Sequence, residues 1–133
     1  MRDEHPIDRL FVTVEGPLPP AVADALRAAA DELAGRRSWV LGPPRFADGL
    51  VLSIYTARPP WGAELDREVD RAHLDEVKEL LGAACRISAD HDVALMVALA
   101  GEDIGEIESG VLDRMLADGL LGEWERVVNS ANG

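Results

Sequence analysis

The sequence predicts an α+β domain in which the elements follow the order strand, helix, strand, strand, helix, strand, with an added C-terminal helical segment. Two patterns predict this class. Short segments rich in β-branched residues alternate with the period of a strand, and two longer segments repeat apolar residues at the spacing of a helix. The 133 residues have the length of one domain with one core. We therefore expect a single domain over residues 1–133, with a frayed tail at 129–133.

The first strand is predicted at residues 9–15, where β-branched and aromatic residues are followed by Gly16. The first helix opens at Pro19-Pro20, because proline suits the first helical turn, where its missing N–H is not needed. Apolar residues recur at helical spacing from there to Gly35, which ends the helix.

Residues 38–41 and 50–56 are predicted to be two strands joined through a tight turn at Asp48-Gly49. This dipeptide supplies the positive φ angles that such a turn requires. Two prolines precede residues 45–46, so we leave open whether these two residues extend the first strand of the pair.

The longest helix is predicted at 63–85, where an apolar stripe runs along one side and charged residues lie on the other. Residues 93–100 form the fourth strand, and because both of its faces are apolar we place it in the centre of the sheet. A turn and a short segment at 104–109 follow. The C-terminal part, 111–128, has a broad apolar stripe and is predicted to be helical, with a break near 118–119, where a glycine interrupts it.

This order of elements resembles the ferredoxin-like split βαβ arrangement (β-α-β-β-α-β, an antiparallel sheet) with an added C-terminal helix. The resemblance covers most of the chain, but it is one of element order alone and rests on no motif. Many unrelated functions use this fold, so the resemblance implies a two-layer architecture and no particular activity.

In such a fold two helices cover one face of the sheet, and the other face must be covered by something else. That face would carry Phe11, Thr13, Glu15, Val51, Ser53, Tyr55, Ala94, Met96 and Ala98. It is too apolar to be left in water, so we expect the C-terminal helix to cover it. The alternatives are a second subunit or a small ligand between the sheet and that helix. Tyr55, Met96 and Trp124 would line such a ligand pocket. His91 or Asp90 would be its titrating group.

The sequence lacks the glycine-rich phosphate and dinucleotide motifs, the serine-hydrolase motif and the zinc-protease motif. Cys85, the single cysteine, lies on the apolar stripe of the longest helix, where a structural thiol is expected rather than a nucleophile. We therefore name no catalytic residue and expect a binding protein rather than an enzyme, with no cofactor.

Two histidines have acidic neighbours. His73 has Asp70 three residues before it and Glu76 three residues after it, a spacing that could place metal ligands on one helix face. No second segment carries a matching set, so we interpret these acids as a solvated helix face and expect no metal. His91 lies between Asp90 and Asp92, where a raised pKa could serve acid–base chemistry, but turn formation by the aspartates is the simpler interpretation.

The chain is acidic, with 25 Asp and Glu against 13 Lys and Arg and a net charge of −12. This charge disfavours binding of nucleic acid through its phosphates. The densest group of acids outside a helix, here called the acidic cluster, consists of Glu102, Asp103, Glu106 and Glu108. A solvated loop is its simplest interpretation. The alternative is a docking surface for a basic protein, to which Asp90 and Asp92 would add.

From these observations we predict a small acidic interaction module that binds and blocks or regulates a basic protein. Immunity proteins that neutralise nuclease toxins fit the same description, which is an analogy of charge and size and not a match of sequence. The alternatives are a small-ligand protein or enzyme that uses the pocket described above, and a homodimer formed through the sheet face. No apolar run has the length of a membrane span, and the first residues lack a signal-peptide core, so we expect a cytoplasmic protein without a membrane partner.

Overall fold

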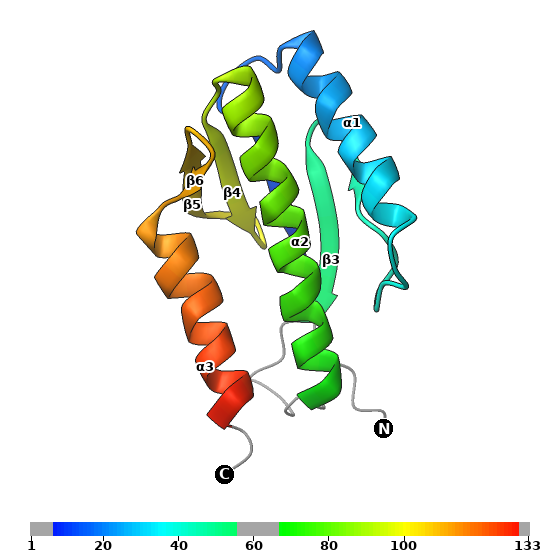
Figure 1. The fold of residues 1–133 in the computed structure, drawn as a ribbon, viewed down its shortest axis with the longest axis vertical. Coiled ribbons are helices and arrows are strands. Elements are labelled where there is room, and N and C mark those ends of the chain that lie inside the picture. The colour runs from blue at the N-terminus through cyan, green and yellow to red at the C-terminus, as the bar shows by residue number, and fades with distance from the viewer. Residues whose placement is uncertain (1–6, 56–66, 131–133) are drawn as a thin grey trace.

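A six-stranded antiparallel sheet carries three helices on one of its faces (Figure 1). The computed structural model describes residues 7–55 and 67–130 of the chain. The strands are β1 (Ile7–Val14), β2 (Arg45–Phe46), β3 (Leu50–Tyr55), β4 (Leu95–Leu99), β5 (Glu102–Glu108) and β6 (Val111–Leu112). The helices are α1 (Pro20–Ala34), α2 (Arg67–His91) and a C-terminal helix made of a π-helical segment, η1 (Met115–Gly122), followed by α3 (Glu123–Ser130).

The strands lie in the order β2-β3-β1-β4-β5-β6, and every neighbouring pair is antiparallel. The predicted α+β class is therefore confirmed. The sheet has two strands more than we predicted, β5 and β6, so its order as a whole differs from that of a four-stranded ferredoxin-like sheet. None of the helices in the described part of the chain is long and apolar enough to cross a membrane.

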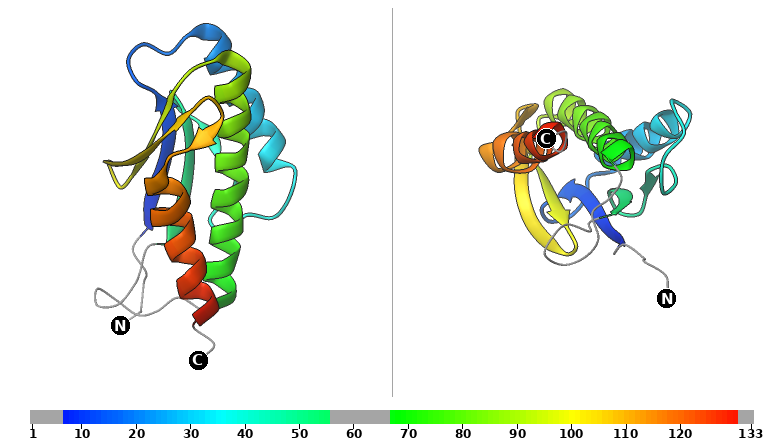
Figure 2. Two further views of the ribbon diagram at one scale, coloured as in Figure 1. Left: turned by 60° about the vertical axis from the view of Figure 1, so that its left-hand side comes forward. Right: turned by 90° about the horizontal axis from the view of Figure 1, so that it is seen from below.

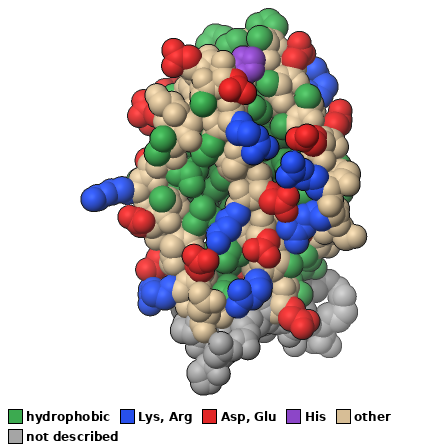
Figure 3. All heavy atoms as spheres, in the orientation of Figure 1, with side chains coloured by type: hydrophobic (Ala, Val, Ile, Leu, Met, Phe, Trp, Pro, Cys, Tyr) green, Lys and Arg blue, Asp and Glu red, His purple; other side chains and the backbone are tan. Residues whose placement is uncertain are grey.

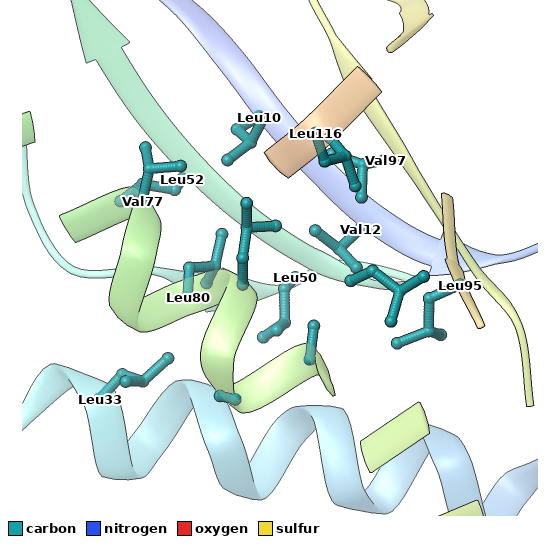
Figure 4. Close-up of a cluster of buried hydrophobic side chains, with 14 of the residues drawn as sticks. Leu10, Val12, Leu33, Leu50, Leu52, Val77, Leu80, Leu95, Val97 and Leu116 are labelled. Carbon is teal, nitrogen blue, oxygen red and sulfur yellow. The ribbon is translucent and has the colours of Figure 1, made fainter. Parts of the chain in front are cut away.

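The core lies between the sheet and the helices. Alternate residues of the central strands point to the helix side, as strand geometry requires. In β1 and β3 these include Leu10 and Leu52, which are direct cross-strand partners and almost fully buried. Leu80 of α2 and Leu33 of α1 lie on the helix side of this layer (Figure 4). Each such leucine contributes about 1.5–3 kcal/mol by leaving water, so this layer supplies much of the stability of the fold.

The prediction of a strand at residues 38–41, the first strand of the expected hairpin, was wrong. Residues 38–41 are not a strand, and the strand that pairs with β3 is the two-residue β2. The indole Nε1 of Trp39 donates a hydrogen bond to the carbonyl of Leu33 in α1, and the backbone N–H of Val40 donates one to Glu76 in α2. Because these bonds tie the segment to the helices, it cannot join the sheet.

The turn between β2 and β3 spans residues 47–49, so it includes the predicted dipeptide, of which Asp48 alone has a positive φ. Asp48 has a φ of 61°, and the hydroxyl of Thr13 donates a hydrogen bond of 2.7 Å to its carbonyl. A Cβ at Gly49 would lie 2.5 Å from the carbonyl oxygen of Val12, so glycine is required there by space.

Helix α2 ends at His91, six residues beyond the predicted end at 85; the predicted start at 63 lies outside the described residues. The added turns bury Ile87 and Ser88, which explains why the helix continues. It stops at Asp92, whose φ of 53° is left-handed, and the N–H of Val93 bonds to the carbonyl of Ser88. This is the Schellman arrangement of a helix end.

Residues 102–108 form strand β5 and not the turn and loop that we predicted. Ala100 and Gly101, with φ angles of 55° and 84°, make the tight two-residue turn that joins β4 to β5. A register shift between Val97 and Ala98 marks a β-bulge in this pair. The acidic cluster therefore lies on a strand.

The C-terminal helix packs beside α2 and against β5, in the same layer as α1 (Figure 2, right). The prediction that it covers the other face of the sheet was wrong. The indole Nε1 of Trp124 donates a 2.6 Å hydrogen bond to Asp70 of α2, and Leu116 fills the space above Gly105 of β5. The predicted break near 118–119 is replaced by the π-helical segment, in which the N–H of Glu123 bonds to the carbonyl of Asp118, five residues earlier.

Candidate functional site

The sheet face opposite the helices, called the open face below, is covered by no helix of the described residues (Figure 2). A row of cross-strand neighbours crosses it in the order Arg45, Val51, Phe11, Ala98 and Asp103. Phe11, Ala98 and the nearby Met96 are half-buried, whereas Arg45 and Asp103 at the two ends of the row are exposed. The face therefore has an apolar centre between a basic side and an acidic side.

The open face is hollowed where β1 begins and β4 ends. A depression of about 660 Å³ is lined there by residues that include Ile7, Arg9, Phe11, Ser53, Ala98 and Gly101. Arg9 and Ser53 are direct cross-strand partners, so the guanidinium and the hydroxyl belong to the same side of the sheet. None of the ion pairs among the described residues involves Arg9.

Three members of the acidic cluster lie on the open face. Asp103 is the cross-strand partner of Ala98 and Glu106 that of Met96, so both carboxylates share the side of the apolar centre. Glu108 follows two residues after Glu106 and lies on the same side. Glu102 is the partner of the inward-facing Leu99 and so lies on the helix side of the strand. The structure thus aligns three carboxylates along one strand.

These carboxylates are electrostatically different from the acids on the helices. Within residues 7–55 and 67–130, no ion pair involves a member of the acidic cluster. On the helix side, Glu79 pairs with Arg36 and Arg37, and Lys78 pairs with Glu125. Figure 3 shows the resulting mixture of positive and negative side chains on that side. Among the described residues, the negative charge of strand β5 therefore has no ion-pair partner.

The two further acids that we assigned to the docking surface lie at the end of α2. Asp90 lines a small groove between α1 and α2 together with Arg86, so it is not on the open face. Asp92 occupies the left-handed position that ends the helix. Both are exposed, and the sequence alone did not separate them from the acids of β5.

The four residues predicted to line a ligand pocket do not surround one cavity. Met96 lies on the open face, whereas Trp124 is buried on the helix side against Asp70. His91 is the exposed last residue of α2. Tyr55 ends β3, where its ring meets that of His73 edge-on with 5.6 Å between the ring centroids. A pocket of these four would need the C-terminal helix on the open face, where it is not.

Sequence reasoning missed a buried hydrogen-bond network on α2. His73 and Glu76 are fully buried, with 3.0 Å between Nδ1 of the imidazole and Oε1 of the carboxylate. The other carboxylate oxygen accepts the N–H of Val40 at 2.8 Å, and Nε2 of the imidazole accepts the N–H of Tyr55 at 3.3 Å. Because Nε2 is an acceptor, the imidazole proton lies on Nδ1 and is donated to Glu76. These hydrogen bonds connect the segment after α1 and the end of β3 to α2.

The interpretation of the acids Asp70 and Glu76 as a solvated helix face was therefore wrong. Both acids and His73 face inward, and the signal was present in the sequence: positions 73, 76, 80, 84 and 87 continue the apolar stripe of the helix. The three side chains do not converge on one point. No group of three or more metal-ligating side chains occurs among the described residues.

Cys85 is half-buried in the same helix. Burial raises the pKa of its thiol above the ordinary value, and the nearby charge of Arg86 offsets part of this effect. A raised pKa lowers the fraction of thiolate at neutral pH, so this thiol is a poor nucleophile.

Comparison with protein-family models, with curated proteins and with solved structures finds no match to this chain. Its function must therefore be inferred from its own residues, and within the described residues the open face offers a candidate site.

Proposed function

We propose that this protein is an interaction module that binds a basic protein through the open face and blocks or regulates it. One observation carries the proposal: the carboxylates of Asp103, Glu106 and Glu108 lie in a line beside an apolar surface, and no ion pair among the described residues neutralises them. An apolar centre with a charged rim is the usual anatomy of a protein interface.

The two parts of this surface contribute differently to binding. Aligned carboxylates attract a positively charged partner and accelerate its approach, an effect that salt screens. Apolar side chains such as Phe11 and Met96 supply affinity when they leave water on contact. The net charge of −12 extends the same attraction over the whole molecule. A role like that of immunity proteins is supported by charge and size only.

We infer further that the first four strands and two helices form a ferredoxin-like unit that β5 and β6 extend. The order β2-β3-β1-β4 within the sheet and the antiparallel pairing of these strands support this assignment. The extension adds the acidic strand to one side of the unit, so it is the added part that supplies the proposed docking charge.

A capture experiment with three forms of the protein tests the proposed function. The first is the wild-type chain, and the second reverses the open-face charges with Asp103→Lys, Glu106→Lys and Glu108→Lys. The third is a control with the same change of net charge on the helices: Asp31→Lys, Glu32→Lys and Asp75→Lys, all of them exposed.

We expect a basic protein to be retained by the wild-type chain and by the helix control, to be lost from the open-face variant, and to be released by salt. If the three forms retain the same proteins, or if the retained protein is not basic, the proposal is wrong.

Binding of a small anionic ligand is a second candidate function, favoured by the depression on the open face. Arg9 and Ser53 would hold the anionic group, and Phe11 would contact an apolar part. Titration of the wild-type chain and of Arg9→Met with phenylpropionate, followed by NMR, tests this. Equal shifts in the two proteins, or none, would exclude the site.

A further inference from the structure

We propose that the partner contacts the open face with an amphipathic α-helix that lies along β1 and β4, with Lys or Arg on the flank that faces β5. This inference rests on the proposed function, since it names the kind of basic segment that the open face takes.

The apolar centre of the open face has the width of one helix. Phe11 of β1 lies beside Ala98 of β4, with Met96 two residues before Ala98 on the same side. Each strand occupies about 5 Å of the width of a sheet, so two neighbouring strands occupy about 10 Å. A helix with its side chains is about 10–12 Å across. A helix on these two strands would therefore contact the apolar residues with one stripe and reach the neighbouring strands with its flanks.

The acids of β5 are spaced to match one flank of such a helix. Asp103 lies beside Ala98 of β4 and Glu106 beside Met96, so the bulge leaves these two acids two strand positions apart along the sheet, and Glu108 lies two positions further on. Two positions of a strand span about 7 Å, and four residues of a helix rise about 6 Å. Basic residues at positions i, i+4 and i+8 of the partner would thus each meet one carboxylate of Asp103, Glu106 and Glu108.

The opposite side of the face restricts the partner further. Arg45 of β2 is exposed there, and Arg9 faces the depression without an ion pair among the described residues. A partner helix that is basic all round would be repelled on this side. The fitting helix is basic on the β5 flank only and neutral or acidic on the flank above β3.

Two other occupants fit less well. A strand added at a sheet edge needs a long free edge, but β2 and β6 have two residues each, and Asp113 already bonds to the outer edge of β5 at Glu106. A second copy stacked face to face about an axis along β1 would bring the two Arg9 side chains together, which like charges oppose. The helix is the occupant that these observations favour.

Three synthetic peptides of about 18 residues test this proposal. The first arranges leucine and lysine with helical period, the second has the same composition with alternating period, and the third is oligolysine of the same charge. Affinity is measured by fluorescence anisotropy. In parallel, ¹³C-methyl NMR on the wild-type chain compares Met96 on the open face with Met115, which is 62% exposed on the helix side.

We expect the helical-period peptide to bind at least tenfold more tightly than the other two and to shift the methyl signal of Met96 and not that of Met115. The substitutions Asp103→Asn, Glu106→Gln and Glu108→Gln should weaken it at least tenfold. The matched control, Asp31→Asn, Glu32→Gln and Asp75→Asn, should change its affinity less than twofold. The NMR readout needs no substitution, so it holds even if a variant is unstable.

The alternative outcomes separate this inference from the proposed function. If oligolysine binds as tightly as the helical peptide and the open-face substitutions abolish both, the helix is wrong but the docking function stands. If the helical peptide binds and neither the open-face substitutions nor the Met96 signal responds, both are wrong. If no peptide binds, the helix inference is overturned, and the capture experiment decides on the docking function.

Discussion

The imidazole Nδ1 of His73 lies 3.0 Å from Oε1 of Glu76, and both side chains are completely shielded from solvent. A buried carboxylate is costly unless hydrogen bonds compensate it. Here each carboxylate oxygen accepts one bond, from His73 and from the backbone of Val40. The pair therefore connects three parts of the chain and makes the stability of α2 depend on the segment that follows α1.

Glu76→Ala should lower the free energy of unfolding by about 3 kcal/mol, because it leaves the buried imidazole N–H of His73 and the backbone N–H of Val40 without their acceptor. Glu76→Gln should cost less, since the amide keeps one acceptor oxygen. Urea denaturation followed by circular dichroism measures both. The exposed neighbour provides the control, and Asp75→Ala should stay within about 0.5 kcal/mol of wild type. A loss for Glu76→Ala no larger than that of the control would contradict the role of the pair.

Substitution of two glycines should have opposite effects. A Cβ at Gly105 would lie 2.3 Å from Cγ of Leu116, so Gly105→Ala should destabilise the protein by about 1–3 kcal/mol. Gly119 has no atom within 4 Å of its added Cβ and lies in a helix, so Gly119→Ala should stabilise it by about 0.5–1 kcal/mol. Thermal unfolding of the two variants tests the packing of the C-terminal helix on β5. Equal effects of the two substitutions would show that this packing is wrong.

Cys85 should react slowly with a thiol reagent in the native protein at pH 8 and at the ordinary rate in urea, because burial raises the pKa of its thiol. The same shift affects stability. The native thiol holds its proton to higher pH than the unfolded one, so its contribution is complete below the unfolded pKa and is lost as pH rises through the folded pKa. Cys85→Ala should therefore show a smaller loss of stability above about pH 9 than wild type. Identical alkaline profiles would argue against the shift.

Asp92→Gly should stabilise the chain by about 0.5–1 kcal/mol, because the φ of 53° at the end of α2 suits glycine better than aspartate. Asp92→Val should be destabilising at the same position, since a β-branched side chain does not tolerate this conformation. Chemical denaturation of the two variants measures the difference. Similar stabilities of the two would mean that the helix does not end in the left-handed conformation.

Much of the fold could be predicted because local patterns and tertiary contacts agree. The alternation around Leu10 and Leu52 and the helical spacing of α1 and α2 each identify an element without knowledge of its neighbours. Strand β5 was not predicted, because a bulge and Gly105 interrupt the alternation of its inward and outward side chains. Its charged residues are also typical of a loop. The acidic cluster was identified as a group, but its line along a strand beside the apolar centre follows only from the register with β4.

The position of the C-terminal helix could not be read from the sequence. Its apolar stripe is compatible with either face of the sheet, and the choice depends on contacts between distant residues. Trp124 bonds to Asp70, and Leu116 packs where Gly105 leaves room. The burial of His73 and Glu76 was missed for a different reason, since charged residue types were weighted above their place in the apolar stripe of α2.

The place of β1 in the sheet has a consequence for how the protein is made. Leu10 pairs with Leu52 on one side of β1 and with Leu99 on the other, so the second neighbour of this strand comes from about 90 residues further along the sequence. Contacts between such distant residues form slowly, because long loops must close before they form. During synthesis, the edge of β1 that pairs with β4 therefore stays unpaired until β4 has left the ribosome. The step most exposed to aggregation is the one that completes the middle of the sheet.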